Sequence, residues 1–247
     1  MVSLGGAPAG PGADVRAMFD RIAGRYQRMN ALMTFGRDRA WRRAVVREAA
    51  LPPGGRLLDL ASGTGDIALE ALAGGPGATV VAADFSLGMM RVGRARPGGA
   101  RVLWCAADAL ALPFADGTFD AVTSGYLLRN VADRAGAFRE QARVVRPGGR
   151  VVCLDTSPPP PSLLRPLVRL YLRRIIPLLG RLVAGDRAAY AYLSASTEGF
   201  KTPAELAAIM REAGLIDVRH RSFMAGPIAV HVGARPGGPA GEGKARG

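Results

Sequence analysis

The stretch that most constrains this chain covers residues 56–66 and reads RLLDLASGTGD. Its leucine-rich first half is a short apolar run of the kind that forms a buried parallel strand. Gly63 and Gly65 then allow a tight turn, and residues 67–72 have helical composition. This arrangement suits a nucleotide-like ligand, because the backbone can approach it closely and free N–H groups point at it. Gly63, Gly65 and Ala68 also fit the dinucleotide fingerprint, so the surroundings must decide between ligands.

The chain repeats this strand-and-helix unit. Strands are predicted from residue 56 and at residues 79–83, 101–106, 119–124 and 150–154. Helices are predicted at residues 67–72, 86–95, 133–146 and 203–213. Two last strand candidates, 216–222 and 228–233, are close in sequence, which predicts an antiparallel hairpin at one sheet edge. The fold class is therefore α/β, a seven-stranded, mostly parallel sheet with an antiparallel C-terminal hairpin and helices on both faces.

One domain is predicted at residues 15–235, between flexible tails at 1–14 and 236–247. Residues 15–50 form two amphipathic helices that precede the sheet and are placed to cover a ligand as a cap. Residues 157–200 interrupt the alternation of strands and helices and are interpreted as a lid insertion.

The helical part of the lid is rich in leucine and arginine. Arg165, Arg169 and Arg173 recur at a spacing that puts them on one helix face. Pro166 and Pro177 predict that this helix is broken into short pieces. The pattern suits either a solvated basic face over an apolar one, or a surface that rests on anionic lipid.

Composition excludes some classes of protein. The apolar fraction of 49% is that of a globular chain, and no apolar run reaches the roughly 18 residues that span a bilayer. The first residues do not resemble a secretory signal, and the two cysteines, Cys105 and Cys153, lie in apolar runs, which predicts reduced thiols in a cytoplasmic protein. The net charge of +13 fits nucleic acid, an acidic membrane surface, or a preference for arginine over lysine. No aromatic RNA-binding signature is present, so no nucleic-acid partner is expected.

Small or acidic residues stand at the carboxyl ends of four successive predicted strands. They are residues 63–65, Asp84, Asp108 with Ala109, and Ser124 with Gly125. Ligands of open α/β sheets bind at these ends. A carboxylate at Asp84 can accept hydrogen bonds from both ribose hydroxyls, and Asp108 can accept one from an adenine amino group. Together the four positions favour an adenosine ligand. Asp59, inside the first strand, is expected to fix the glycine turn through backbone hydrogen bonds.

Several stretches carry a resemblance to a known family. The glycine turn with Asp84, Asp108 and the RPGGR turn at 146–150 resembles the class I S-adenosylmethionine-dependent methyltransferases. Other stretches resemble the UbiE/MenG/Coq5 family, whose members C-methylate quinol rings in menaquinone and ubiquinone synthesis. These are FDRIAGRYQRMNALMTFG at 19–36, Trp41-Arg42, ALPFADGTFD at 111–120, LLRNV at 127–131 and GDRAAYAYLSAS at 185–196.

The resemblance implies a Rossmann-like fold, S-adenosyl-L-methionine as cofactor, a prenylated quinol as substrate and no metal. The implied cofactor-binding residues are Asp59, Gly63, Thr64, Gly65, Asp84, Phe85, Asp108, Ala109, Ser124 and Gly125. The implied catalytic residues are Arg129, Asn130 and Tyr26, and Asn30 belongs with Tyr26 to a motif that closes over the site. Gln27 departs from the family pattern, which usually has Asp there.

The expected chemistry is carbon methylation. An aromatic carbon becomes a good nucleophile when an ortho hydroxyl loses its proton, and such enzymes act by positioning and by stabilising developing charge. Arg129 keeps its proton and is expected to stabilise the phenolate, directly or through a water. His231 is a base candidate by residue type, but its apolar strand favours a structural role.

The residues leave other functions open. One is an NAD-dependent oxidoreductase with the same glycine turn, one is a non-catalytic RNA- or membrane-binding module, and one is a methyltransferase acting on another phenol or amine. The sequence does not choose between a naphthoquinol and a benzoquinol acceptor. It predicts a cytoplasmic protein that meets the inner face of the membrane peripherally, and it is compatible with a homodimer.

Overall fold

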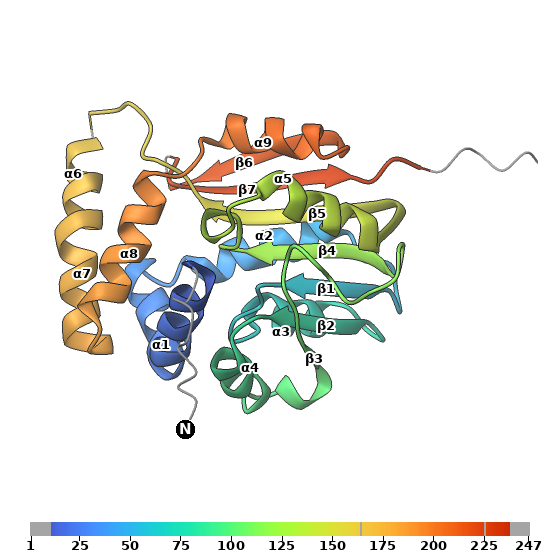
Figure 1. Ribbon diagram of the computed structural model, residues 1–247, viewed down its shortest axis with the longest axis horizontal. Coiled ribbons are helices and arrows are strands. Elements are labelled where there is room, and N and C mark those ends of the chain that lie inside the picture. The colour runs from blue at the N-terminus through green and yellow to red at the C-terminus, as the bar shows by residue number, and fades with distance from the viewer. Residues whose placement is uncertain (1–10, 164, 225, 238–247) are drawn as a thin grey trace, which may run out of the picture.

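Strand β1 (Arg56–Leu60) lies inside a seven-stranded sheet whose order is β3-β2-β1-β4-β5-β7-β6. The computed structural model describes residues 11–163, 165–224 and 226–237 (Figure 1). The other strands are β2 (Thr79–Asp84), β3 (Leu103–Ala106), β4 (Phe119–Gly125), β5 (Val145–Thr156), β6 (Ile216–Phe223) and β7 (Ile228–Ala234). Strands β1 to β5 pair in parallel, while β7 is antiparallel to both β5 and β6. The predicted parallel sheet with a C-terminal antiparallel hairpin at one edge is confirmed.

Helices cover both faces of the sheet because its strands are apolar on both sides. The helices beside the sheet are α2 (Asp38–Ala49), α3 (Asp66–Gly74), α4 (Leu87–Arg94), α5 (Arg134–Val144) and α9 (Pro203–Glu212). Leu58 packs in one core with Phe138 of α5 and Leu206 of α9. Its neighbour Leu57 packs in the opposite core, with Trp41 of α2 and other residues of α2 and α3. This alternation follows from the two-residue period of a strand.

The lid segment is helical without interruption from Arg165 to Ala184, so the predicted break at two prolines is wrong. It consists of α6 (Arg165–Leu170), a π-helical turn η3 (Tyr171–Ile175), α7 (Ile176–Leu179) and a second π-helical turn η4 (Gly180–Ala184). Pro166 is at the start of α6, where a missing N–H costs nothing. Pro177 follows the first π-helical turn, in which the N–H of Ile176 bonds five residues back to the carbonyl of Tyr171. The wider turn therefore accommodates the proline.

Helix α1 (Pro11–Met33) and the lid, whose last helix is α8 (Arg187–Glu198), stand beyond the carboxyl ends of the parallel strands, on the left of Figure 1. They share a third core that contains Ile22 and Met29 of α1, Met89 of α4 and Tyr190 of α8. Residues 11–14, which the sequence placed in the flexible tail, are the first residues of α1. The rest of that predicted tail, and most of the C-terminal one, lies outside the described residues.

Several helix and strand boundaries differ from the prediction. Residues 99–101 form a 3₁₀ turn, so β3 begins at Leu103. Helix α5 ends at Val144 because Pro147 cannot continue a helix, and β5 begins at Val145, so the predicted turn at 146–150 lies inside this strand. In the part of the chain that the structure describes, no helix is both long enough and apolar enough to cross a membrane.

Candidate active site

The glycine turn after β1 uses its two glycines differently. Gly63 has φ = 55° and open space where a side chain would start, with no heavy atom of another described residue within 4 Å of a Cβ built there. Gly65 has φ = 77°, and a Cβ there would lie 2.6 Å from the ring of Trp104. Gly65 therefore serves packing, whereas Gly63 leaves the backbone open to a ligand.

Asp84, the last residue of β2, is bonded to this turn. Its Oδ2 accepts the N–H of Gly63 at 2.7 Å, and its Oδ1 accepts the N–H of Ser86 at 2.8 Å. Burial raises the pKa of Asp84, and these backbone N–H groups oppose that effect. Each carboxylate oxygen keeps further acceptor capacity, which fits the predicted contact with ribose hydroxyls.

Asp59 lies beneath the turn and is fully buried. One carboxylate oxygen accepts the N–H of Ala68 at 3.1 Å, and the other accepts the hydroxyl of Thr123 at 2.9 Å. Burial raises the pKa of Asp59 to about 7. As expected from the sequence, its hydrogen bonds are made within the protein, where they join α3 to strands β1 and β4.

The end of β3 carries an exposed carboxylate next to a buried residue. Asp108 is exposed and accepts the N–H of Leu110 at 2.9 Å, while the following Ala109 is buried. Phe85, directly after Asp84, is half-buried. These residues lie at the ends of neighbouring strands, because Asp84 pairs with Ala106 in the register of β2 and β3.

The end of β4 differs from the prediction. Ser124 is fully buried, and its Oγ lies 3.4 Å from the side-chain oxygen of Gln141 in α5. Its side chain therefore points into the core between the sheet and α5, away from the glycine turn, and only its backbone remains available there. A Cβ at Gly125 would lie 2.9 Å from Ile67 at the start of α3, so this position is close to the turn.

Helix α1 covers the glycine turn, a feature that the sequence did not reveal in detail. Asp20 Oδ1 accepts hydrogen bonds from the Ser86 hydroxyl at 2.6 Å and from the N–H of Gly88 at 2.8 Å. Gln27 donates to Asp66 at 3.3 Å and to the hydroxyl of the buried Thr64 at 3.5 Å. No local pattern could have identified these contacts, because they join segments about 40 to 70 residues apart.

Arg42 of α2 ties the cap to the turn. Its guanidinium lies 2.9 Å from Asp38 and 3.1 Å from Asp66, and the second arginine Arg96 lies 2.8 Å from Asp66. These side chains are largely buried, so the pairs hold α2 and α3 in a fixed relation.

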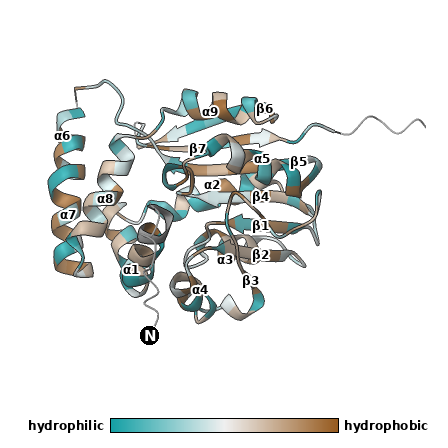
Figure 2. Ribbon diagram, in the orientation of Figure 1, coloured by the Kyte–Doolittle hydropathy of each residue, from teal (hydrophilic) through white to brown (hydrophobic). Residues whose placement is uncertain are grey.

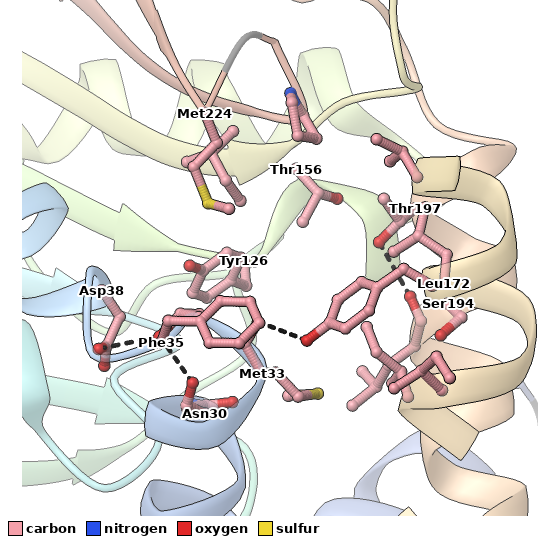
Figure 3. A pocket seen from close by; sticks show the side chains of 18 of the residues that line it. Asn30, Met33, Phe35, Asp38, Tyr126, Thr156, Leu172, Ser194, Thr197 and Met224 are labelled. Carbon is pink, nitrogen blue, oxygen red and sulfur yellow. Dashed lines mark hydrogen bonds between the residues drawn. The ribbon is translucent and has the colours of Figure 1, made fainter. Parts of the chain in front are cut away.

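A cavity of about 580 Å³ opens beside the turn, between the cap, the end of β4 and the lid (Figure 3). Most of the side chains that line it are apolar. They include Met33, Phe35, Trp41, Leu167, Leu172, Ile176, Leu193, Met224 and Ile228. Of the predicted catalytic residues, Tyr26 and Arg129 line it and Asn130 does not.

Arg129 provides a buried positive charge in this apolar wall. Its side chain is 6% exposed and lies 3.5 Å from Asp155 and 3.3 Å from the hydroxyl of Thr156. Burial raises the pKa of Asp155, and the charge of Arg129 opposes the rise. The Nε of Arg129 has no hydrogen-bond partner among the described residues. Because Arg129 lines the cavity, its guanidinium places a positive charge beside any ligand that enters.

Tyr26 and Asn30 lie together on the cavity side of α1. Burial raises the pKa of Tyr26, and a hydrogen bond with Asn30 opposes the rise. His231, by contrast, lies in β7 and its Nε2 is 2.9 Å from the carbonyl of Pro203. Burial lowers the pKa of His231 to about 4, which agrees with a structural role.

Comparison with known proteins decides the family. Residues 10–235 match the model of the ubiE/COQ5 methyltransferase family. The chain belongs to this family. A relative from Desulfotalea psychrophila, named ubiquinone/menaquinone biosynthesis C-methyltransferase UbiE, is 51% identical over 92% of this chain and 91% of its own. Demethylmenaquinone methyltransferases from Roseiflexus castenholzii and Thermus thermophilus are 48% and 46% identical, over 90% and 89% of this chain and 94% and 100% of their own.

Solved structures agree with the fold. An S-adenosylmethionine-dependent methyltransferase from Thermotoga maritima superposes with a TM-score of 0.64 at 19% identity, over 90% of this chain and 99% of its own. Phosphoethanolamine N-methyltransferase 2 of Haemonchus contortus, solved with S-adenosylmethionine, has a TM-score of 0.59 at 17% identity, over 80% of this chain and 52% of its own. The ubiE/COQ5 protein described here is thus an S-adenosylmethionine-dependent methyltransferase of class I fold. The open turn at Gly63 and the carboxylate of Asp84 fit that cofactor.

Proposed function

We propose that this enzyme C-methylates the ring of a prenylated quinol, with demethylmenaquinol as the first candidate and the benzoquinol precursor of ubiquinone as the second. The observation that carries the proposal is the apolar cavity with the buried Arg129 in its wall. An apolar cavity with few polar groups accepts an aromatic ring and a hydrocarbon tail. The names of the relatives, demethylmenaquinone methyltransferase and UbiE, support the same substrate class.

The cofactor-binding residues proposed from the sequence are retained with two adjustments. Gly63, Thr64, Gly65, Asp84, Phe85, Asp108, Ala109 and Gly125 are proposed to contact the cofactor. Asp59 acts by holding the turn, and Ser124 contributes its backbone alone. When bound, the cofactor supplies a methyl group made electrophilic by its sulfonium.

Arg129 is proposed to stabilise negative charge on the acceptor. Loss of a ring hydroxyl proton to water pushes electron density onto the ortho carbon, which then attacks the methyl group as S-adenosylhomocysteine leaves. Loss of the ring C–H proton to water restores the aromatic ring. The guanidinium of Arg129, which lines the cavity, is proposed to donate to the resulting phenolate oxygen. Asp155 holds the guanidinium in place through its ion pair, and the low polarity of the cavity strengthens the interaction. Tyr26 faces the same cavity and is proposed to contact the acceptor.

The lid is proposed to admit the prenyl tail and to rest on anionic lipid. Leu167, Leu170 and Leu182 are strongly exposed, and Figure 2 shows hydrophobic and hydrophilic residues interleaved along α6 and α7. Of the three arginines predicted on one helix face, Arg173 is not available to lipid, because it pairs with Glu198 of α8 at 2.8 Å. Exposed leucines beside Arg169 are suited to a lipid surface.

Sedimentation with vesicles tests the membrane proposal. The protein should pellet with anionic vesicles, less so in high salt, and Leu182→Ser should weaken binding. Leu103→Ser, which changes an exposed leucine on the distant edge strand β3, should leave it unchanged. Equal pelleting with neutral and anionic vesicles would contradict the proposal. Peripheral localisation and a homodimer stay predictions, and the mass of the protein in solution tests the latter.

A panel of acceptors tests the proposed reaction. The enzyme and S-adenosylmethionine are incubated with reduced demethylmenaquinone, the reduced benzoquinone precursor, a tailless naphthoquinol and a simple amine. Turnover of a prenylated quinol at least about tenfold faster than of the tailless one is expected, because the tail buries apolar surface in the cavity. Preference for the amine would contradict the proposal.

A further inference from the structure

Backbone strain gathers around the cavity. Among the residues that the structure describes, six that are not glycine have a positive φ, and three of them line the cavity: Phe35, Tyr126 and Met224. Bulky side chains rarely adopt this conformation. Strained residues persist where surrounding contacts hold them, and they concentrate at functional sites.

Tyr126 differs from the other two in its position. Phe35 is 71% exposed and Met224 is 40% exposed, whereas Tyr126 is half-buried. Tyr126 directly follows β4, with φ = 59°, at the edge of the sheet where the glycine turn lies. Tyr126 therefore lines the cavity where the cavity meets the end of β4 (Figure 3).

Three hydrogen bonds hold the strained turn. The N–H of Tyr126 donates to the carbonyl of Leu154 in β5 at 2.7 Å. The carbonyl of Tyr126 accepts the Asn130 amide Nδ2 at 3.0 Å, and the Oδ1 of Asn130 accepts the hydroxyl of Tyr192 in α8 at 3.1 Å. A chain of contacts thus runs from α8 through Asn130 to the backbone of Tyr126.

The ring of Tyr126 also contacts Arg129. The guanidinium carbon of Arg129 lies 5.0 Å from the centre of the ring, a cation–π distance. Burial raises the pKa of Tyr126, so its hydroxyl stays neutral. The rigid turn therefore fixes an aromatic surface and the buried cation relative to each other.

Both ends of the Asn130 amide are occupied within the protein, and Asn130 does not line the cavity. We propose that Tyr126 is a further substrate-contacting residue whose ring forms the wall on which an aromatic acceptor lies, and that Asn130 and Tyr192 are positioning residues that act through it. Aromatic rings favour offset or edge-on contacts with one another, which a fixed wall can orient. This inference rests on the proposed function, because it requires an aromatic acceptor.

A double-mutant cycle separates positioning from direct contact. Tyr126→Gly removes the ring and adopts a positive φ without strain, so the fold should be kept. We expect it to raise the KM for reduced demethylmenaquinone about tenfold, and Asn130→Ala to raise it to a similar extent. The two changes together should raise the KM no more than Tyr126→Gly alone, because Asn130 acts through the ring. Multiplied effects in the double variant would show that Asn130 binds the substrate directly and would overturn the proposal.

Three further variants serve as controls. Tyr126→Phe keeps the ring, so its KM should stay within about twofold of the wild-type value. An increase in KM equal to that of Tyr126→Gly would assign the role to the hydroxyl and would contradict the proposal that the ring forms the wall. Tyr192→Phe should behave like a milder Asn130→Ala, and a KM unchanged in it would remove Tyr192 from the proposal. Ala50→Gly relieves a similar strain, φ = 45°, outside the cavity and should leave the KM unchanged. An increase there matching that of Tyr126→Gly would count against a specific contact.

A binding measurement keeps this inference apart from the proposed function. Oxidised 2-prenyl-1,4-naphthoquinone is titrated in the presence of S-adenosylhomocysteine, and quenching of Trp41, which lines the cavity, reports binding. Tyr126→Gly should weaken binding about tenfold. If the wild type methylates no quinol, and Tyr126→Gly still binds the naphthoquinone about tenfold more weakly than the wild type, only the proposed function is contradicted. A wild type that methylates quinols, while Tyr126→Gly binds the naphthoquinone normally, contradicts only the inference.

Discussion

The carboxylate of Asp84 accepts the backbone N–H of Gly63 at 2.7 Å. The end of β2 is therefore bonded to the turn after β1, and the turn is held in the conformation that presents Gly63 to open space. A group with acceptor capacity thus stands next to a backbone that a ligand can touch, which is consistent with the cofactor site proposed above.

A methyl group added to Gly63 should block cofactor binding. Gly63→Ala places a Cβ in the open space and adds strain of about 1 kcal/mol, because φ is 55°. Gly148→Ala is the matched control, since Gly148 has φ = 75° and equally open surroundings near the start of strand β5, at the opposite end of the sheet. Both variants should lose similar stability on urea unfolding. Calorimetry should show at least about a tenfold loss of S-adenosylmethionine affinity in Gly63→Ala alone, and equal affinities in the two variants would contradict the assignment.

The packing of α1 against α4 should control how fast the cofactor dissociates. A Cβ at Gly88 would lie 2.5 Å from Asp20 Oδ1 and 3.2 Å from the Asp20 backbone, so Gly88→Ala displaces α1 from the glycine turn. Stopped-flow measurement should show dissociation of S-adenosylmethionine about tenfold faster than in the wild type. Gly74→Ala, where a Cβ meets no atom within 4 Å, should keep the wild-type rate. An unchanged dissociation rate in Gly88→Ala would show that α1 does not hold the cofactor in place.

Arg129 should be needed for turnover and not for cofactor affinity. Arg129→Lys keeps a charge for the buried Asp155 but loses the planar fork of donors. A fall in kcat of about 100-fold is expected, because one preorganised donor to a developing charge is removed. Calorimetry should give a Kd for S-adenosylmethionine within about twofold of wild type. Arg139→Lys on the exposed face of α5 is the control, and a wild-type kcat in Arg129→Lys would remove Arg129 from the reaction.

His231 should make stability depend on pH. Burial lowers its pKa to about 4, while the unfolded chain binds the same proton with a pKa of about 6.5. The unfolded state therefore gains more protons as the pH falls from 6.5 to 4, and the free energy of unfolding decreases over that window. The loss at pH 5 should be roughly 2 kcal/mol relative to pH 8. Urea unfolding of His231→Gln should lack this part of the pH dependence, and His220→Gln should keep it. A wild type and His231→Gln with parallel pH profiles would show that His231 is not buried as a neutral ring.

The parts of the fold that could be predicted are those encoded locally. Short apolar runs and the glycine turn predicted the sheet, and acidic residues at strand ends predicted where its carboxyl edge would bind a cofactor. The direction of the Ser124 side chain, toward Gln141 of α5, could not be predicted because it depends on which side of β4 faces α5, and this depends on pairing with distant strands.

Contacts between distant segments could not be predicted. Asp20 meets Ser86 and Gly88 only after α1 has packed across the sheet end. Pro177 normally ends a helix, and the π-helical turn that accommodates it depends on packing against α8. The left-handed backbone at Tyr126 likewise depends on a distant contact, because its N–H bonds to Leu154 of β5, in addition to the nearby Asn130.

The most direct test of the central claim follows the methyl group. The enzyme is incubated with S-adenosylmethionine labelled with ¹³C in its methyl group and with reduced demethylmenaquinone, and the product is analysed by mass spectrometry and ¹³C NMR. The label should appear as one methyl group on a ring carbon of the quinone. Label on an oxygen atom, or no label in the quinone while S-adenosylmethionine is consumed on another acceptor, would contradict the account.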